Sequence, residues 1–225
     1  MRRAAMLLAG LWTAFAPARV RGDAGELAAL TAGLPTCDAG RAHCIGIRLH
    51  IAVGPRAGDG PIAQANWLAA QFAVANVQLA PLDVAVQVVG IDALPASAGH
   101  IATRGERDAL SAGGLPGKVL HVFITGRLDD VDQPDGFIRG VTWHTRGSAR
   151  KYVILSTAAP DRVLAHELGH VFGLPHSAYA RSIMNKTQRT KPPPEDRVFV
   201  DEEIAAMRPV LQRLLRDGVI ADLTH

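Results

Sequence analysis

The residues with the clearest chemistry are three histidines and a glutamate that lie close together. His166 and His170 are four positions apart, so on a helix both imidazoles lie on one face and can bind one metal ion. The carboxylate of Glu167 can take a proton from a water molecule that the ion activates, and pass it to a leaving amine. Gly173 can end the helix, because glycine adopts left-handed backbone angles without steric cost, and the turn returns His176 to the ion. Three imidazoles leave one tetrahedral position open, which is typical of a catalytic zinc site.

The segment HELGHVFGLPH, followed by SIMN at 182–185, resembles the metzincin clan of zinc endopeptidases, which share a long zinc signature and a Met-turn. His176 is followed by Ser177, and with the spacing to Met184 this pattern is most similar to the matrixins. Asn185 follows the methionine, so the Met-turn tyrosine of astacin-like and serralysin-like members is missing. This departure favours the matrixins over those two groups.

The resemblance implies a zinc-dependent endopeptidase, a hydrolase acting on peptide bonds, with one catalytic Zn²⁺ as cofactor. The zinc ligands would be His166, His170 and His176, the general base would be Glu167, and Met184 would lie beneath the zinc as an apolar floor. Two alternatives remain open. A non-proteolytic zinc hydrolase, acting on amides in cell-wall peptides or small molecules, would keep every one of these motifs. A recognition module with a purely structural zinc is the other, although such a site has no need of the base.

Hydrophobic periodicity predicts the elements that position these residues. Apolar residues alternate or run continuously in predicted strands at 45–53, 84–89, 119–124, 138–144 and 152–156. Helical spacing predicts a helix at 61–78 that has Pro61 in its first turn, and a short helix at 103–111. Further helices are predicted to run through the zinc motif and from Asp201 onward, the last one interrupted by Pro209.

The resemblance and this order of elements imply an α+β fold of the metzincin-like zincin type. We expect a twisted five-stranded mixed sheet with an active-site helix, a Met-turn and a C-terminal helix. By the resemblance, the strand at 138–144 would be the exposed edge of the sheet, above the cleft. Such an edge can add an extended peptide as a further antiparallel strand through main-chain hydrogen bonds. We therefore expect a polypeptide substrate bound along this edge.

Residues 1–18 have the pattern of a signal peptide. A basic start is followed by an apolar run at 4–16 that is too short to span a bilayer, and then by small residues that suit cleavage after Ala18. The alternative is an apolar N-terminal helix retained in the fold. No later stretch is long and apolar enough for a membrane span. We therefore expect a secreted or periplasmic chain with no membrane span once the signal is removed.

Cys37 and Cys44 are the only cysteines, and in an exported protein a close pair most simply forms one disulfide, here within an N-terminal segment at 19–44. A competing hypothesis is that the sequence at 34–37 is similar to the matrixin cysteine switch, in which a thiolate caps the zinc of the zymogen. The later residues of that motif are absent. The disulfide is the favoured prediction.

An acidic loop precedes the predicted edge strand. Several hard oxygen ligands lie close together there, as a calcium site requires: Asp129, Asp130, Asp132 and Asp135. The alternative is an ordinary acidic turn, because Pro-Asp-Gly alone predicts a turn. Matrixins carry a similar loop that holds structural metal, and His144 stands about where one structural zinc ligand would lie, but the other histidines of that second zinc site have no counterpart. Ca²⁺ is thus a possible second ion, with Asp130, Asp132 and Asp135 as candidate ligands.

Length and charge limit the remaining possibilities. The chain has 225 residues, enough for a single metalloprotease catalytic domain at 45–225. Its formal net charge is +3, with no long run of one sign, so composition gives no support for nucleic acid as the main partner. We expect a monomer.

Overall fold

The computed structural model describes residues 24–37, 40–56, 58–148, 150–187 and 191–224. The predicted signal peptide at 1–18 lies outside the described residues. None of the helices in the described part of the chain combines the length and the apolar character needed to cross a bilayer.

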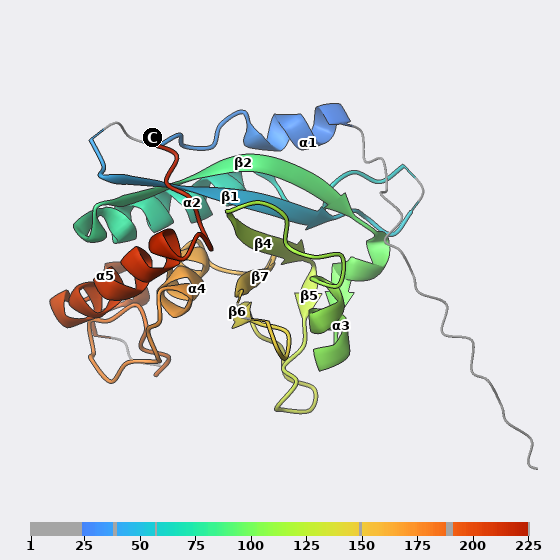
Figure 1. Cartoon of the computed structure of the whole chain (residues 1–225). Helices are drawn as coiled ribbons and strands as arrows, with labels where there is room; N and C mark the ends of the chain where they lie inside the picture. The colour runs from blue at the N-terminus through green and yellow to red at the C-terminus, as the bar shows by residue number, and fades with distance from the viewer. Residues whose placement is uncertain (1–23, 38–39, 57, 149, 188–190, 225) are drawn as a thin grey trace, which may run out of the picture.

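A five-stranded mixed sheet forms the centre of the molecule, with the strand order β2-β1-β4-β7-β6 (Figure 1). Strands β2, β1, β4 and β7 run parallel to one another, and β6 pairs antiparallel with β7. The strands are β1 (His43–Ala52), β2 (Val84–Leu94), β4 (Leu120–Thr125), β6 (Gly140–Trp143) and β7 (Tyr152–Ser156). Because β6 is at the edge, its outer backbone has no strand partner among the described residues.

In the described part of the chain, five α-helices accompany the sheet: α1 (Ala24–Thr31), α2 (Ala65–Leu79), α3 (Arg104–Ala109), α4 (Val163–Val171) and α5 (Asp201–Arg216). Short 3-10 turns occur at Ala80–Leu82, Ala96–Gly99 and Pro194–Asp196. A separate parallel pair joins β3 (His100–Ile101) to β5 (Arg127–Leu128). The sequence did not predict this pair, because two residues are too few to show an alternation.

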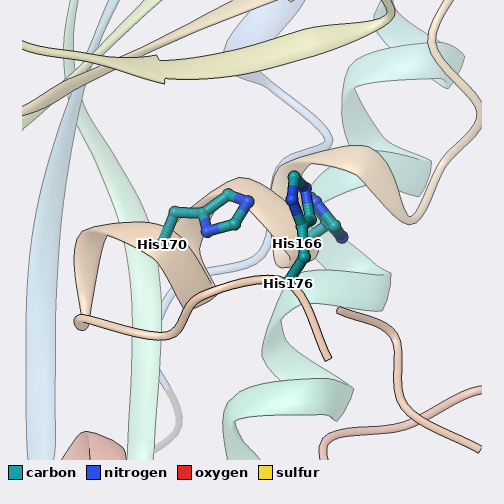
Figure 2. Close-up of side chains that lie close together, drawn as sticks. All are labelled: His166, His170 and His176. Atoms are coloured by element: carbon teal, nitrogen blue, oxygen red, sulfur yellow. The ribbon is translucent and has the colours of Figure 1, made fainter. Parts of the chain in front are cut away.

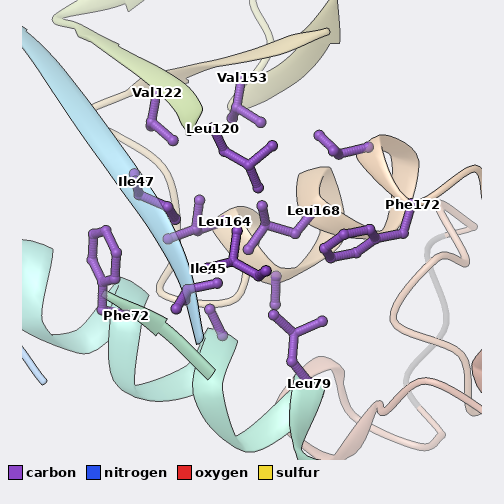
Figure 3. Packing of buried hydrophobic residues seen from close by; sticks show 14 of the residues in the cluster. Ile45, Ile47, Phe72, Leu79, Leu120, Val122, Val153, Leu164, Leu168 and Phe172 are labelled. Carbon is purple, nitrogen blue, oxygen red and sulfur yellow. The ribbon is translucent and has the colours of Figure 1, made fainter. Parts of the chain in front are cut away.

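The core fixes α4 against the sheet. One face of β1 is fully buried and packs with apolar residues of α2 and α4 (Figure 3). The contributing side chains are Ile45, Ile47, Leu49 and Ile51 of β1, Leu68, Phe72 and Leu79 of α2, and Leu164 and Leu168 of α4. Burial of one such side chain contributes about 1.5–3 kcal/mol. This cluster therefore holds α4 in place from its buried side, which leaves the opposite face for chemistry.

Three predicted boundaries need correction. Pro61 does not start a helix; it forms an isolated bridge with Val53, and α2 begins at Ala65. Strand β2 continues past residue 89 to Leu94, because its second half pairs with the second half of β1. Pro209 does not interrupt the last helix, since α5 runs continuously from Asp201 to Arg216. A buried stripe that includes Met207 and Leu211 packs on the core and offsets the hydrogen bond that proline cannot donate.

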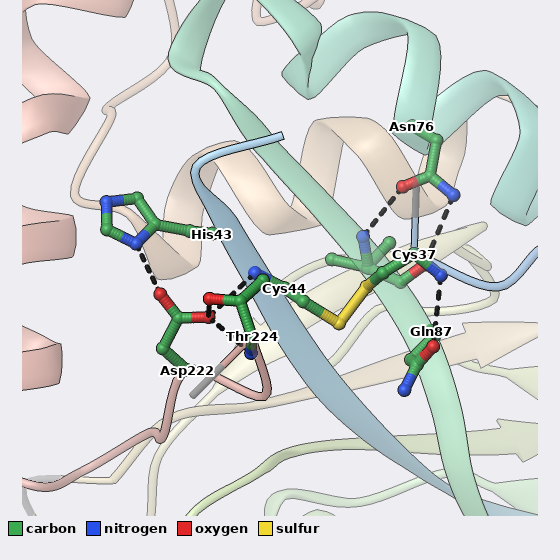
Figure 4. Close-up of a disulfide and its surroundings, with 8 residues drawn as sticks. Cys37, His43, Cys44, Asn76, Gln87, Asp222 and Thr224 are labelled. Atoms are coloured by element: carbon green, nitrogen blue, oxygen red, sulfur yellow. Dashed lines mark hydrogen bonds and ion pairs between the residues drawn. A yellow bond between two sulfur atoms is a disulfide. The ribbon is translucent and has the colours of Figure 1, made fainter. Parts of the chain in front are cut away.

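The predicted disulfide between Cys37 and Cys44 is confirmed, with the two Cα atoms 5.7 Å apart (Figure 4). The sulfur of Cys37 is therefore not available as a free thiolate for a cysteine switch. The Cys37 amide donates to Gln87 of β2 at 3.0 Å, and the Cys44 amide donates to Asp222 at 3.0 Å. Asp222 also lies 2.6 Å from Nδ1 of His43. The start of β1 thus joins the N-terminal segment to the C-terminal tail.

Candidate metal centre

The helix α4 presents two of the three histidines on its less buried face. Leu164 and Leu168 are fully buried in the core, whereas His166 and His170 are half-buried on the other side. The chain leaves the helix at Gly173, whose φ of 95° lies in the left-handed region, as the sequence predicts. The helical spacing of His166 and His170 therefore places both on one face of α4, and Gly173 allows the chain to turn after the helix.

The structure brings His166, His170 and His176 together, with their candidate ligand atoms all within 4.8 Å of one another (Figure 2). The first two lie on α4 and the third on the loop that follows it. Within the described residues, this is the one cluster of three or more side chains that could hold a metal ion.

Backbone carbonyl groups fix the tautomers of two ligands. Nδ1 of His166 lies 2.8 Å from the carbonyl oxygen of Ile183, and Nδ1 of His170 lies 2.7 Å from that of Leu174. A carbonyl only accepts, so each Nδ1 carries the proton and each Nε2 keeps a free lone pair. Burial lowers the pKa of His166 to about 4, and it also lowers the pKa of His170 and His176. The neutral, donor-ready imidazoles fit a zinc ion.

Glu167 is buried beside the histidines, with 4% of its surface exposed. Burial raises the pKa of Glu167 to about 7, and a hydrogen bond from Thr142 opposes this rise. The Thr142 hydroxyl lies 2.9 Å from Oε2 of Glu167 and 2.8 Å from its carbonyl oxygen, and its single proton can go to one of them at a time. Thr142 lies on β6, so the edge strand contacts the candidate base directly. No local sequence pattern indicates a role for this residue.

Met184 is fully buried against α4. A Cβ atom built on Gly169 would lie 2.6 Å from Sδ of Met184 and 2.8 Å from Cε1 of Phe199. The missing side chain at position 169, between the two helical histidines, therefore makes room for the methionine. The Met184 amide donates to the Ser182 hydroxyl at 2.8 Å, and that hydroxyl donates to Glu203 of α5 at 2.6 Å. The turn is thus connected to the last helix.

Lys151 is a second residue near the site that no sequence pattern indicates. Its Nζ donates to the carbonyl oxygen of His170 at 2.7 Å, at the C-terminal end of α4, where a cation interacts favourably with the helix dipole. Burial and the charge of Arg213 lower the pKa of this amine.

The contacts of the acidic loop do not support the possible calcium site. Asp129 accepts hydrogen bonds from His100 at 2.9 Å and from Arg127 at 2.6 Å. Asp132 forms an ion pair with Arg104. These carboxylates are turned toward cationic side chains and an ion is not needed to neutralise them.

The other two aspartates of this loop belong to a tight turn. Oδ1 of Asp130 accepts the amide of Asp132 at 2.9 Å, and Asp135 has a positive φ of 61°, both features of a tight turn. His144 is exposed and lies outside the one metal-capable cluster of the described residues. The ordinary acidic turn is therefore the better description of the loop, and the second-zinc hypothesis has no support either.

A pocket of about 240 Å³ opens beside His166 and Glu167. Four cationic residues contribute to its lining, and we call it the cationic pocket: Arg139, Arg162, Lys186 and Arg197. A larger pocket of about 500 Å³ lies between α3 and the turn after β6, and Asp108, Ser111 and Arg150 are among its lining residues. Size favours the larger one, but none of the three clustered histidines lines it. The smaller pocket is the relevant one, because it contacts the candidate base and a candidate ligand.

Comparisons with known proteins agree with this arrangement. The matrixin family model matches residues 140–207, less than half of the chain, and this segment includes β6, α4 and the start of α5. No curated protein matches the chain. The match confirms the resemblance that the zinc motif and Met-turn predict.

Two archaemetzincins are among the similar solved structures. The one from Methanopyrus kandleri is 20% identical with a TM-score of 0.51, over 78% of this chain and 100% of that chain. The one from Archaeoglobus fulgidus, complexed with malonate, is 16% identical with a TM-score of 0.41, over 72% of this chain and 99% of that chain. At 20% identity, the likeness to the first of these proteins concerns the fold alone. It confirms the expected α+β, metzincin-like architecture.

Proposed function

From the matrixin match and the metzincin fold, which indicate a zinc metallopeptidase, we propose that the chain is a zinc-dependent endopeptidase that hydrolyses internal peptide bonds of polypeptides. The observation that carries this proposal is the convergence of His166, His170 and His176, with ligand atoms within 4.8 Å, beside a buried Glu167. A purely structural zinc site has no use for a buried carboxylate at this place.

The three histidines would hold Zn²⁺ through their imidazole nitrogens. When bound, zinc supplies a Lewis acid that polarises the scissile carbonyl and makes a water molecule more acidic. Glu167 takes one proton from the attacking water and delivers it to the nitrogen of the departing amine, as the carbon–nitrogen bond breaks. Burial raises the pKa of Glu167, which favours a carboxylate that can hold the proton before releasing it. Thr142 orients the carboxylate through its hydroxyl.

Polypeptides are the substrate class that the edge strand favours. The outer backbone groups of β6 have no strand partner among the described residues, so an extended peptide can add to them. The Thr142 side chain of this same strand reaches Glu167. A peptide bound along β6 would therefore lie next to the base.

We further propose that the protein acts outside the cytosol, as a secreted or periplasmic enzyme. The signal-peptide pattern at 1–18 supports this, and the Cys37–Cys44 disulfide suits an oxidising compartment. N-terminal sequencing of protein recovered from the medium or periplasm should give a start near residue 19. Recovery of the chain only from the cytosol, with residue 1 retained, would contradict this proposal.

The deciding experiment compares the wild type with Glu167→Gln. Zinc content per chain and cleavage of an unfolded protein are measured in parallel. We expect one zinc in both proteins and a loss of cleavage of at least about a hundredfold in the variant. Glu202→Gln, at an exposed position of α5, is the matched control and should keep full activity.

Equal cleavage by wild type and Glu167→Gln would overturn the assigned mechanism. One zinc per chain without cleavage of any protein or peptide would support the small-amide hydrolase or the recognition module instead.

A further inference from the structure

The cationic pocket has an unusual charge balance for a site beside a candidate base. Arg139 precedes β6, Arg162 precedes α4, and Lys186 and Arg197 follow Met184. Glu167 is the one carboxylate among its lining residues. Three separate segments of the chain therefore place positive charge around one small cavity.

Internal contacts leave much of this charge available. Arg162 is half-buried, and neither its guanidinium nor the amine of Lys186 has a hydrogen bond or an ion pair with the described residues. Arg139 donates to the carbonyl oxygen of Ala158 and lies 5.4 Å from the ring centre of Phe137. Arg197 is buried and donates to the carbonyl oxygen of Asn185 at 3.0 Å among other contacts, so Arg162 and Lys186 supply most of the available charge. The carbonyl group of Ala158 orients the Arg139 guanidinium group without cancelling its charge.

These features favour an anionic group in the pocket. A guanidinium group binds a carboxylate through two parallel hydrogen bonds, which are about twice as strong as neutral ones. An apolar side chain would displace water from the cations without replacing the hydrogen bonds that the water made. A lysine or arginine side chain would be repelled by the positive charge. The volume of about 240 Å³ is below the range of drug-sized ligand sites and suits one side chain.

The position of the occupant along the substrate follows from the role of Glu167. This residue lines the pocket and, in the proposed function, delivers a proton to the departing amine. The amine belongs to the residue directly after the cleaved bond, so that residue has its side chain closest to the pocket. We propose that the cationic pocket selects polypeptides with aspartate or glutamate directly after the cleaved bond, with Arg162 as the main specificity-determining residue. This inference rests on the proposed endopeptidase function.

The test begins with the cleavage sites of the zinc-loaded enzyme in an unfolded protein, mapped by mass spectrometry. A peptide that spans the best site is then made with Glu, Gln or Lys after the cleaved bond. We expect kcat/KM for the Glu peptide to exceed that for the Gln peptide by at least about tenfold, and to exceed that for the Lys peptide further. Added salt should reduce the preference, because the pocket is open to solvent.

Variants of Arg162 test whether the cationic pocket causes the preference for the Glu peptide. In Arg162→Gln the Glu-over-Gln ratio should fall at least about threefold, and in Arg162→Glu it should fall further, while the Lys peptide gains relative to the Glu peptide. Arg56→Gln removes the same charge at an exposed position outside the pocket and should keep the wild-type ratio.

Binding gives a second readout that does not depend on turnover. Fluorescence anisotropy measures the affinity of labelled Glu and Gln peptides for Glu167→Gln and for the double variant Glu167→Gln/Arg162→Gln. The Glu peptide should bind the first protein at least about tenfold more tightly than the Gln peptide does, and this ratio should fall at least about threefold in the second.

The outcomes separate the two proposals. Cleavage with no acidic preference, or a preference that Arg162→Gln leaves intact, overturns the specificity and leaves the endopeptidase in place. No cleavage together with an Arg162-dependent preference in binding overturns the endopeptidase and retains the pocket as a carboxylate site. Neither cleavage nor preferential binding overturns both.

Discussion

At the scale of single residues, the space at position 169 matters as much as the zinc ligands. Met184 and Phe199 occupy the volume that a side chain there would fill. Ile183, next to the methionine, also supplies the carbonyl that fixes the tautomer of His166. Packing and ligand orientation are therefore coupled through one turn of chain.

Gly169→Ala should destabilise the protein by about 1–3 kcal/mol, because the added methyl group would displace Met184. Zinc affinity should fall as well, since the displaced turn carries the Ile183 carbonyl. Urea unfolding of the metal-free protein and competition with a chelator measure the two effects. Gly105→Ala places the same methyl group in α3, where only Thr103 lies near, at 3.9 Å, and should be neutral or stabilising. Equal behaviour of the two variants would contradict the packing argument.

Thr142→Val should lower kcat/KM at pH 7 by about tenfold. The hydroxyl lowers the pKa of Glu167, so its removal raises that pKa, and less of the carboxylate is ionised at a given pH. The acidic limb of the pH profile should move to higher pH. Thr142→Ser keeps the hydroxyl and should keep the wild-type profile. An unchanged pH profile for Thr142→Val would show that the Thr142 hydroxyl does not influence Glu167.

At the scale of elements, α2 holds the start of α4 through one buried side chain. Gln71 is fully buried, and its Nε2 donates to the carbonyl oxygen of Pro160 at 2.7 Å. Its Oε1 accepts the amide of Leu164 at 3.0 Å. The residue before α4, Arg162, provides no side-chain cap, so the cap comes from another helix.

Gln71→Leu should destabilise the fold by about 2–4 kcal/mol, because a buried amide and a buried carbonyl lose their partner. Gln64→Leu, at an exposed position just before α2, is the matched control and should change stability by no more than about 0.5 kcal/mol. Denaturant unfolding of both variants measures the difference. Similar midpoints would show that α4 does not depend on the cap.

At the scale of the whole molecule, the segment before β1 and the C-terminal tail meet at the start of β1. Burial alone would raise the pKa of Asp222, but hydrogen bonds from the Cys44 amide, His43 and Thr224 outweigh it and hold that pKa well below its usual range. The native pKa is lower than the unfolded one, so the stabilisation is fully present above about pH 4. It is lost as the pH falls below that value, through the native pKa.

Asp222→Asn should therefore cost about 1–3 kcal/mol at pH 7, and the difference from wild type should shrink as the pH falls below about 4. Unfolding free energies at several pH values measure this trend. Asp217→Asn, an exposed position just after α5, should show no such trend. A penalty for Asp222→Asn that stays constant down to pH 2 would contradict the ionic origin of the effect.

The parts of the structure that local patterns govern were predictable. The alternation of Ile45, Ile47, Leu49 and Ile51 gave β1, and the spacing of the histidines gave the ligand cluster. The contacts of Thr142 with Glu167 and of Gln71 with α4 join segments that are distant in the sequence, so no local pattern predicts them. The cationic pocket collects charges from three segments, so only the folded chain reveals it. The predicted helix start at Pro61 and the predicted helix interruption at Pro209 are wrong, because tertiary packing overrides the local preferences of these prolines.

The orientation of β6 has a consequence for the proposed antiparallel docking of a peptide. A peptide added antiparallel to β6 runs in the same N-to-C direction as β7, β4 and β1. In this binding mode, the direction of β6 fixes which half of the peptide comes first along the strand, before any side chain is recognised. A peptide with the same residues in reverse order would offer them to the site in the wrong sequence. Composition alone therefore does not define a substrate for this fold.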